Sequence, residues 1–257
     1  MLGLIYSVGA YLGFLAAYVY FACFSAGVLV PKTVDSGLLP SAGFALLVDL
    51  GLILSFGLQH SIMARGWFKR WLTRFVPASL ERSTYVLGST LVLALLIWQW
   101  RAIPTQLWNV ESPTPAAILW SLNALGWLGV PLSSLLIDHF DLFGVKRAFN
   151  GFRRVSFQGK GFVTPLLYKY VRHPMMTSLL VALWVTPQMT IGHLLLSLGM
   201  TAYILIGVQF EERALIEELG VAYIAYQKAT PKFLPGGKAT TVDAGTPTST
   251  SAPRGST

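Results

Sequence analysis

Charged side chains are scarce in this sequence, where Asp, Glu, Lys and Arg make up only 12% of the 257 residues. A soluble domain usually carries about 25% charge, so this chain has too little polar surface to face water on all sides. Hydrophobic residues account for 54% of the chain, and the mean hydropathy is +0.58. The scarcity of charge excludes an ordinary soluble globular protein and indicates a membrane protein.

Cysteine is nearly absent, because Cys23 is the single one in the chain. One cysteine excludes an intramolecular disulfide, a CxxC redox motif and a cysteine-rich metal site. Cys23 lies within an apolar run, so we interpret it as a small core residue. The sequence predicts no metal site.

Acidic residues are fewer than basic ones, 11 against 19, which gives a net charge of +8. In a soluble protein this excess would suggest nucleic acid as a partner. Here the cations concentrate in two loops between apolar runs, a pattern typical of cytoplasmic loops next to anionic lipid headgroups. We therefore expect membrane lipids as partners and no nucleic acid.

Long apolar runs are abundant, and a helix needs about 20 residues to cross a bilayer. The fifth run holds 37 residues and is interrupted at Thr186-Pro187 and Gly192. It therefore predicts a helical hairpin with a short first arm, although a single broken span is the alternative. We expect an all-α, polytopic bundle of five to six membrane helices, the last pair being the hairpin. The runs cover residues 2–30, 43–63, 83–100, 116–143 and 174–210.

The distribution of Lys and Arg over the loops predicts the orientation. Loops 64–82 and 144–173 carry five and seven basic residues, whereas loops 31–42 and 101–115 carry one each. Both basic loops are therefore expected in the cytoplasm, together with the N-terminus. The first apolar run lacks a preceding basic region and is too long for a cleaved signal peptide, so we expect it to stay as a helix. This arrangement corresponds to a bacterial-type inner (cytoplasmic) membrane protein.

The segment after the hairpin predicts a short, polar cytoplasmic helix over 211–235, and Gly220 is expected to end or interrupt its first part. The last 20 residues consist mainly of Thr, Ser, Gly, Ala and Pro. They have too few large apolar side chains to order themselves. We expect one membrane domain over 1–237 and a disordered tail over 238–257.

The densest group of polar residues lies next to the hairpin. Pro174 suits the first turn of a helix, which places Arg172 and His173 at a helix N-terminus that favours anions. The guanidinium of Arg172 adds a bidentate donor for the carboxylate of a ligand. A hairpin would bring Glu211 and Glu212 to the same membrane face. Basic and acidic groups would then converge, as a zwitterionic ligand requires. The alternative is a set of ordinary interfacial ion pairs.

Two segments carry a resemblance to a known family: RHPMMTSLL (172–180) and FEERALIEELGVAYIAYQKATPKFLP (210–235). They resemble the isoprenylcysteine carboxyl methyltransferase-like integral membrane methyltransferases. That family's signature is Arg-His-Pro-x-Tyr-x-Gly, an apolar hairpin, a Glu-Glu pair, Gly-x-x-Tyr-x-x-Tyr and a Pro-x-x-x-Pro ending. The chain departs from it where Met176 replaces the usual Tyr and Ser178 the usual Gly, positions expected to shape the pocket near the cofactor.

A narrower resemblance extends over nearly the whole chain. Residues 58–65, 138–144 and 182–193 are similar to the branch that contains the methanethiol S-methyltransferases. This branch implies methylation of a small volatile thiol, methanethiol to dimethyl sulfide, with S-adenosylmethionine as the methyl donor. The alternative within the family is an isoprenylcysteine-type carboxyl methyltransferase. The sequence does not predict an oligomeric state.

The resemblance also implies which residues form the site. The cofactor-binding part covers about 165–235 and is expected to use eight side chains: Tyr168, Arg172, His173, Pro174, Glu211, Glu212, Tyr223 and Tyr226. For the two tyrosines of the last helix, anchoring in the membrane interface is the alternative.

Thiol activation needs a base or a nearby cation, because the thiolate is the reactive form. The candidates at the cytoplasmic helix ends are His60, Asp138, His139 and Arg172. The alternative for His60 is a structural hydrogen bond between helices. For Asp138 and His139 the alternative is a helix cap or an ion pair with the basic loop.

A haem- or quinone-binding membrane protein is the rival from another class, since histidines on facing helices can ligate haem. The chain has four histidines. His60, His139 and His173 are all predicted at the cytoplasmic side, and only His193 at the other. Because no two spans place histidines at mid-membrane depth, the pattern favours the methyltransferase. A transporter is disfavoured because the chain shows no repeated halves.

Overall fold

The computed structural model describes residues 1–155 and 162–236. In that part of the chain five helices are long and apolar enough to cross a membrane. They confirm the prediction of an all-α polytopic membrane bundle. These helices are α1 (Leu2–Ala26), α2 (Ala42–Met63), α4 (Glu81–Gln99), α5 (Pro113–Ile137) and α9 (Ile191–Leu219).

Shorter elements occupy the two ends of the bundle. One short apolar helix, α8 (Pro174–Trp184), packs along α5. The others are α3 (Gly66–Leu72), η1 (Ala78–Leu80), β1 (Gln106–Asn109), α6 (His139–Leu142), α7 (Val145–Arg153), η2 (Leu166–Lys169), β2 (Gln188–Thr190) and α10 (Val221–Ala229).

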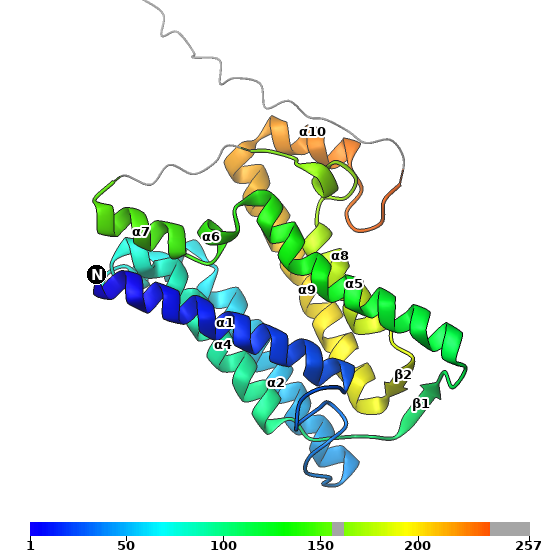
Figure 1. Ribbon diagram of the computed structural model, residues 1–257. Coiled ribbons are helices and arrows are strands. Elements are labelled where there is room, and N and C mark those ends of the chain that lie inside the picture. Colours follow the sequence, from blue (N-terminus) through cyan, green and yellow to red (C-terminus); the bar gives the residue numbers. More distant parts are fainter. Residues whose placement is uncertain (156–161, 237–257) are drawn as a thin grey trace, which may run out of the picture.

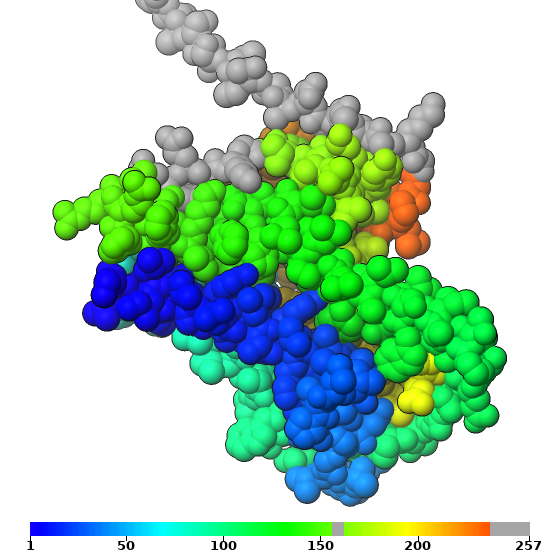
Figure 2. All heavy atoms as spheres, viewed as in Figure 1, coloured from blue at the N-terminus to red at the C-terminus, as the bar shows by residue number. Residues whose placement is uncertain are grey.

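The long helices form two packed groups. Helices α1 and α2 both contact α4, whereas α8 contacts α5 and α9, and the contact between α2 and α9 joins the groups. The N-terminus, α6, α7 and α10 lie toward one end of the bundle, and β1 and β2 lie at the other (Figure 1). In the space-filling view, the atoms of α1 lie against those of α7 (Figure 2). Because α7 also contacts η1, the two basic loops share one end, as predicted.

The hairpin prediction is confirmed by a contact between its two arms. Arg172, just before α8, donates a hydrogen bond from Nε to Glu212 Oε1 in the last third of α9, at 2.8 Å. These residues lie 40 positions apart, so the chain must reverse direction between them. The turn itself contains β2, which pairs antiparallel with β1. The sequence did not predict these two strands.

Two predicted boundaries are wrong. The second arm of the hairpin does not end at 210, since α9 continues through Glu211 and Glu212 to Leu219. A polar side chain ends a membrane run but does not end a helix, so residues 211–219 of the predicted helix over 211–235 belong to α9, and the later part forms α10, which ends at Ala229. Gly220 separates the two helices, as predicted, with a positive φ of 58°. The fourth run ends at Ile137 rather than 143, because Asp138 adopts an extended conformation.

Close backbone packing joins α8 to α5. A Cβ atom added to Gly126 would lie 2.6 Å from the backbone nitrogen of Ala182, and one added to Gly129 would overlap Ser178 Oγ. Small residues at helix contacts in membranes allow such close approach. The predicted boundary at 237 and the predicted tail over 238–257 lie outside the described residues.

Candidate active site

A buried carboxylate forms the centre of a polar network at the start of α8. Glu212 accepts hydrogen bonds from Arg172 Nε at 2.8 Å and from Lys232 Nζ at 3.1 Å, and its Oε1 lies 3.0 Å from His173 Nε2. The Arg172 and Glu212 side chains are only 10% and 8% exposed. We call these four residues the Glu212 network. The structure thus brings together the basic and acidic residues that the sequence predicted to converge.

Within this network Arg172 ties the C-terminal segment to the hairpin. Its Nη1 donates to the backbone oxygens of Gln227, at 2.9 Å, and Thr230, at 2.5 Å. The backbone N–H of Arg172 donates to Pro231 O at 2.9 Å. The guanidinium was predicted to bind a ligand carboxylate, but the carboxylate that it contacts is that of Glu212.

Three of the predicted cofactor-binding residues are buried tyrosines that pack next to the network. Tyr226 donates its hydroxyl hydrogen to the backbone oxygen of Tyr168 at 2.5 Å, and Tyr223 and Tyr226 are each only 2% exposed. Burial raises the pKa of Tyr226 to about 12 and raises the pKa of Tyr168 and Tyr223 as well. Their burial argues against the alternative in which Tyr223 and Tyr226 anchor the chain in the lipid interface.

A cavity of about 360 Å³ lies beside the network, between α2, α4 and α9. Glu211 lines it with a half-exposed side chain, and its Oε2 lies 3.7 Å from His173 Nδ1. The two adjacent glutamates therefore differ: Glu212 is enclosed by cations, and Glu211 faces the open space. We call this space the His60 cavity; its polar lining residues are His60, Ser61, Arg65, Arg82, Tyr85, Tyr203 and Glu211.

His60 lines this cavity and also makes the interhelical hydrogen bonds that were its alternative role. Its Nδ1 lies 3.1 Å from Ser89 Oγ, and its Nε2 is hydrogen-bonded to the Tyr85 hydroxyl. A neutral imidazole has one donor and one acceptor nitrogen. If the tyrosine donates to Nε2, then Nδ1–H donates to the serine. Phe56 and Tyr203 pack on the imidazole ring at centroid distances of 5.5 and 5.7 Å.

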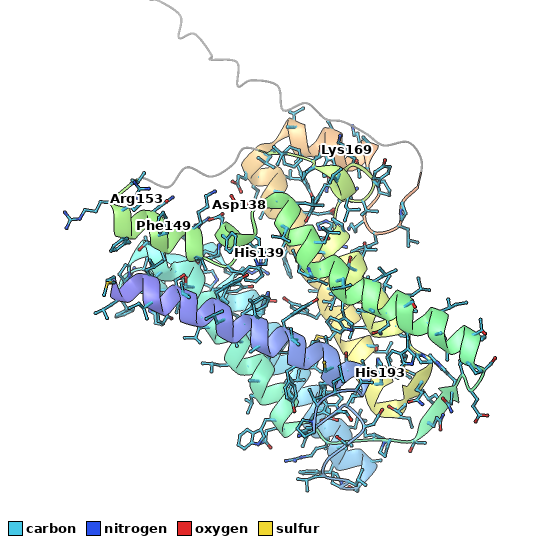
Figure 3. The ribbon with its side chains drawn as sticks, in the orientation of Figure 1. Asp138, His139, Phe149, Arg153, Lys169 and His193 are labelled. Carbon is cyan, nitrogen blue, oxygen red and sulfur yellow. The ribbon has the colours of Figure 1, made fainter. Side chains whose placement is uncertain are left out.

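Asp138 and His139 lie at the same end of the bundle but do not line the His60 cavity (Figure 3). Asp138 accepts a hydrogen bond from Lys146 Nζ at 2.5 Å and one from the backbone N–H of Asp141. His139 is bonded through both ring nitrogens, to Tyr11 and to Ser134, each at 2.7 Å. Burial lowers the pKa of His139. The structure therefore favours the predicted alternative, a cap and an ion pair.

Sequence analysis missed Tyr85, Arg65 and Arg82 as cavity residues. The signal that could have found Arg82 and Tyr85 is their spacing of three in the first turns of the third apolar run, which puts both on one helix face. Arg65 is the last residue of the segment 58–65 that carries the narrower resemblance, but it was otherwise noted only as a loop charge. No local sequence pattern could show that these residues face α9, because this depends on how the helices pack.

The two departures from the family signature have different surroundings. Met176 lines the His60 cavity, as expected for that position. Ser178 lies instead against Gly129 of α5. The residue at position 178 therefore adjusts helix packing, and position 176 adjusts the cavity.

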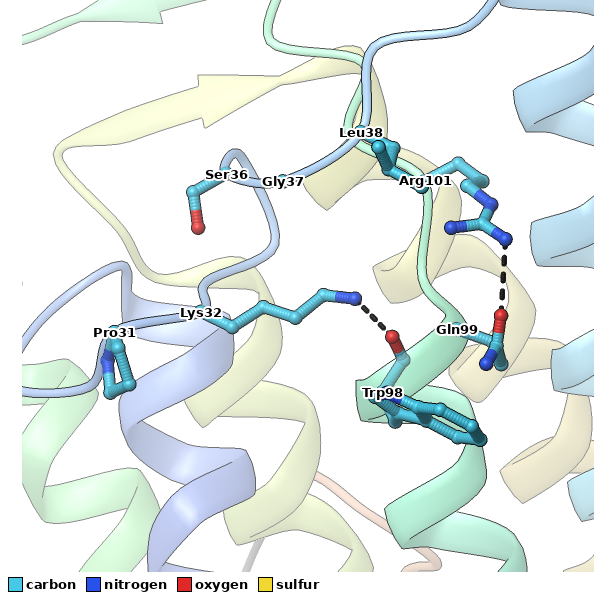
Figure 4. A pocket seen from close by; sticks show the side chains of 8 residues that line it. All are labelled: Pro31, Lys32, Ser36, Gly37, Leu38, Trp98, Gln99 and Arg101. Atoms are coloured by element: carbon cyan, nitrogen blue, oxygen red, sulfur yellow. Dashed lines mark hydrogen bonds between the residues drawn. The ribbon is translucent and has the colours of Figure 1, made fainter.

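A second, larger cavity of about 530 Å³ lies at the opposite end, where α4 ends (Figure 4). Lys32 Nζ donates to Trp98 O, and Arg101 Nη2 donates to Gln99 Oε1 at 3.0 Å. None of the predicted site residues is among the described residues that line it. Across residues 1–155 and 162–236 no three His, Cys, Asp or Glu side chains form a group that could hold a metal ion.

Comparison with known proteins finds close relatives over almost the full length. The chain is 48% identical over 232 residues to methanethiol S-methyltransferase 2 of Bradyrhizobium diazoefficiens, covering 90% of this chain and 89% of the relative. It is 47% identical over 234 residues to methanethiol S-methyltransferase of Mycobacterium tuberculosis, covering 91% and 96%. Nurim of Bos taurus is 32% identical over 174 residues, covering 62% of this chain and 63% of Nurim.

No family model matches the chain, and no solved structure matches it. The two methanethiol S-methyltransferases nevertheless exceed 40% identity over about nine-tenths of both sequences, which leaves no large part of the chain without a counterpart. The long apolar helices agree with a membrane protein, and the names of these relatives imply a methyltransferase that uses a methyl donor. The chain belongs to the methanethiol S-methyltransferase family of integral membrane methyltransferases.

Proposed function

We propose that this protein transfers a methyl group from S-adenosylmethionine to methanethiol, forming dimethyl sulfide, at the cytoplasmic side of an inner membrane. The observation that carries the proposal is the His60 cavity, which places the His60–Tyr85 pair and Glu211 around one space beside the Glu212 network. The names of the close relatives supply the substrate.

The size of the cavity supports a small acceptor. Ligand cavities usually measure about 300–1,000 Å³, and about 360 Å³ is near the lower end of this range. A prenylated cysteine would need a long apolar groove in addition to the space for the donor. A thiol with one carbon needs only a small volume next to the methyl group.

The cavity also suits a methyl donor with an amino-acid end, because guanidinium groups and a carboxylate line the same space. S-adenosylmethionine, when bound, supplies a methyl group on a positively charged sulfur. Glu211 would hold the donor's ammonium group, and the Glu212 network with Pro174 would keep the cavity wall in place. Tyr168, Tyr223 and Tyr226 would support the network by packing next to it.

Thiol activation is assigned to the His60–Tyr85 pair. The S–H bond of methanethiol breaks as its proton passes to Tyr85 Oη, while the tyrosine's own proton passes to His60 Nε2. The imidazolium that forms keeps its Nδ1–H bond to Ser89, and the thiolate is left facing the methyl group. Exclusion of water and in-line approach then supply most of the remaining acceleration. Arg172 acts here by positioning, and Asp138 and His139 are structural.

The deciding experiment uses purified protein in detergent with methyl-labelled S-adenosylmethionine and either methanethiol or farnesylcysteine. We expect labelled dimethyl sulfide with methanethiol and no product with farnesylcysteine. Methylation of farnesylcysteine alone would move the protein to the carboxyl methyltransferase branch. A Soret band without any methyl transfer would support the haem-binding rival.

The cytoplasmic placement of the site has a separate test. Single cysteines replace the exposed residues Arg153, in α7, and Glu111, between β1 and α5, in a Cys23→Ser background. These positions lie at opposite ends of the bundle. An impermeant thiol reagent added outside intact cells should label the cysteine at 111 and not the one at 153. The reverse pattern would put the His60 cavity on the outer side.

A further inference from the structure

The His60 cavity contains cationic groups that have no anionic partner in the described part of the chain. The Nε atom of Arg82 is buried and makes no hydrogen bond there. Arg65 lines the same cavity, and its guanidinium lies 4.0 Å from the centre of the Phe210 ring, a cation–π contact rather than an ion pair. Leaving a buried donor unsatisfied costs about 1–3 kcal/mol, more for a charged group.

The cations of the Glu212 network and of the α6–α7 region differ from these two. Arg172 and Lys232 share Glu212, and Arg147 donates to Asp141 at 2.8 Å. Each of those cations therefore already has a carboxylate within the fold. The arginines of the His60 cavity are in the opposite situation, so their missing partner is expected to come from a ligand.

Glu211 completes the arrangement with the opposite charge. It is the one carboxylate among the described residues that line the cavity, and its side chain is half exposed. Two guanidinium groups and one carboxylate around one space match a ligand that carries both a carboxylate and an ammonium group. A planar guanidinium can bind a carboxylate with two parallel hydrogen bonds, which fixes its orientation.

We infer that Arg82, assisted by Arg65, binds the carboxylate of the methyl donor's amino-acid end, while Glu211 binds the ammonium group. This assignment rests on the proposed function. It moves the carboxylate-binding role from Arg172, whose guanidinium is engaged within the fold, to two arginines contributed by α4 and by the residue before α3. The donor would then join α4 to α9 across the cavity.

The test measures binding rather than turnover. Purified protein in detergent is titrated with S-adenosylmethionine and with its decarboxylated form. Wild-type protein should bind the carboxylate-bearing form at least about tenfold more tightly, a difference of about 1.4 kcal/mol. Arg82→Met should remove this preference by weakening the carboxylate-bearing form about tenfold and leaving the decarboxylated form within about twofold.

Three variants serve as controls. Arg82→Lys keeps the charge without the two-pronged geometry and should recover part of the preference. Arg65→Met should reduce it in the same direction. Arg74 is an exposed arginine of loop 64–82 and does not line the cavity, so Arg74→Met should leave binding unchanged. Elution from size exclusion as a single peak checks that each variant is folded.

The outcomes separate this inference from the proposed function. If Arg82→Met weakens both ligands equally, or neither, the carboxylate lies elsewhere and the inference is overturned. In either case methylation of methanethiol by the wild-type protein would leave the proposed function standing. If methanethiol is not methylated but the selective loss appears, the carboxylate subsite holds and the acceptor assignment fails.

Discussion

The Glu212 network and the His60 cavity are neighbours on α9, but charged groups are paired within the fold in the network, whereas the cavity holds cationic groups that have no anionic partner in the described part of the chain. In the network one buried carboxylate has three nitrogen partners within 3.1 Å, from Arg172, His173 and Lys232. In the cavity Arg82 Nε has no hydrogen-bond partner among the described residues. Buried polar groups in native proteins are nearly always satisfied, so the exceptions need an explanation. The comparison supports our proposals that the Glu212 network stabilises the fold and that the ligand binds in the His60 cavity.

Among the variants that test this difference, removal of the proposed proton acceptor should have the largest effect, a loss of kcat. His60→Ala takes away a cavity group and leaves the Glu212 network intact, so kcat should fall by roughly 10²–10⁴-fold while donor binding stays near wild type. Tyr85→Phe should lower kcat in the same direction. Single-turnover kinetics and titration separate the two steps. Full turnover in both variants would contradict the assigned proton path.

The pH profile sharpens that prediction. If a base takes the thiol proton, kcat/KM should rise with pH through the pKa of that base and then level off. Tyr85→Phe breaks the path to the imidazole, so the rise should shift or disappear. Buffers from pH 5 to 9 cover the range of this test. An unchanged profile in the variant would show that another group limits activation.

Breaking the network itself should give the next effect, on both stability and binding. Glu212→Ala leaves Arg172 buried without its carboxylate, and loss of one partner of a buried pair costs about 3–5 kcal/mol. We expect a lower thermal unfolding midpoint in detergent and donor binding at least about tenfold weaker. Glu217→Ala is the matched control, since Glu217 is exposed. If Glu212→Ala bound the donor with wild-type affinity, the Glu212 network would have no role in donor binding.

His139 should give the smallest effect, because it is a buried and partnered group away from the cavity. Its folded pKa is lowered by burial, so below the unfolded value of about 6.5 the unfolded chain binds a proton that the folded chain does not. The contribution to stability is therefore complete above that value and declines as the pH falls toward the folded pKa. His139→Gln should reduce this loss between pH 7 and 5, measured by thermal unfolding. Methyl transfer at neutral pH should change little; a loss as large as that in His60→Ala would return His139 to the site.

The fold was predictable where a physical signal is local. Runs of apolar residues long enough for a bilayer identified the spans, and Thr186-Pro187 marked the turn of the hairpin. The end of α9 was not predictable from hydropathy, because Glu211 and Glu212 end the apolar run while their backbone stays helical to Leu219. The β1–β2 pairing was missed because segments of four and three residues, about 80 positions apart, carry no periodic signal.

The candidate site was predictable where a motif lies in one stretch of sequence. The convergence of Arg172 and His173 with Glu212 followed from the signature and the hairpin together. The sequence did not show which polar groups already have a hydrogen-bond partner within the fold. This depends on how α2 and α4 pack against α9. Only the structure therefore shows that Arg172 is paired with Glu212 and that Arg82 Nε has no partner among the described residues.

The close contact between α5 and α8 has a consequence for variation within the family. Ser178 and the hydrogen of Gly129 share one small volume, and a Cβ atom at 129 would overlap the serine hydroxyl. The two positions are therefore expected to vary as a pair. A relative with glycine at position 178, as the wider signature has it, gains room for alanine or serine at position 129. In such a relative α5 instead of α8 would contribute the side-chain atom at this contact, and the distance between the two helix axes would stay the same.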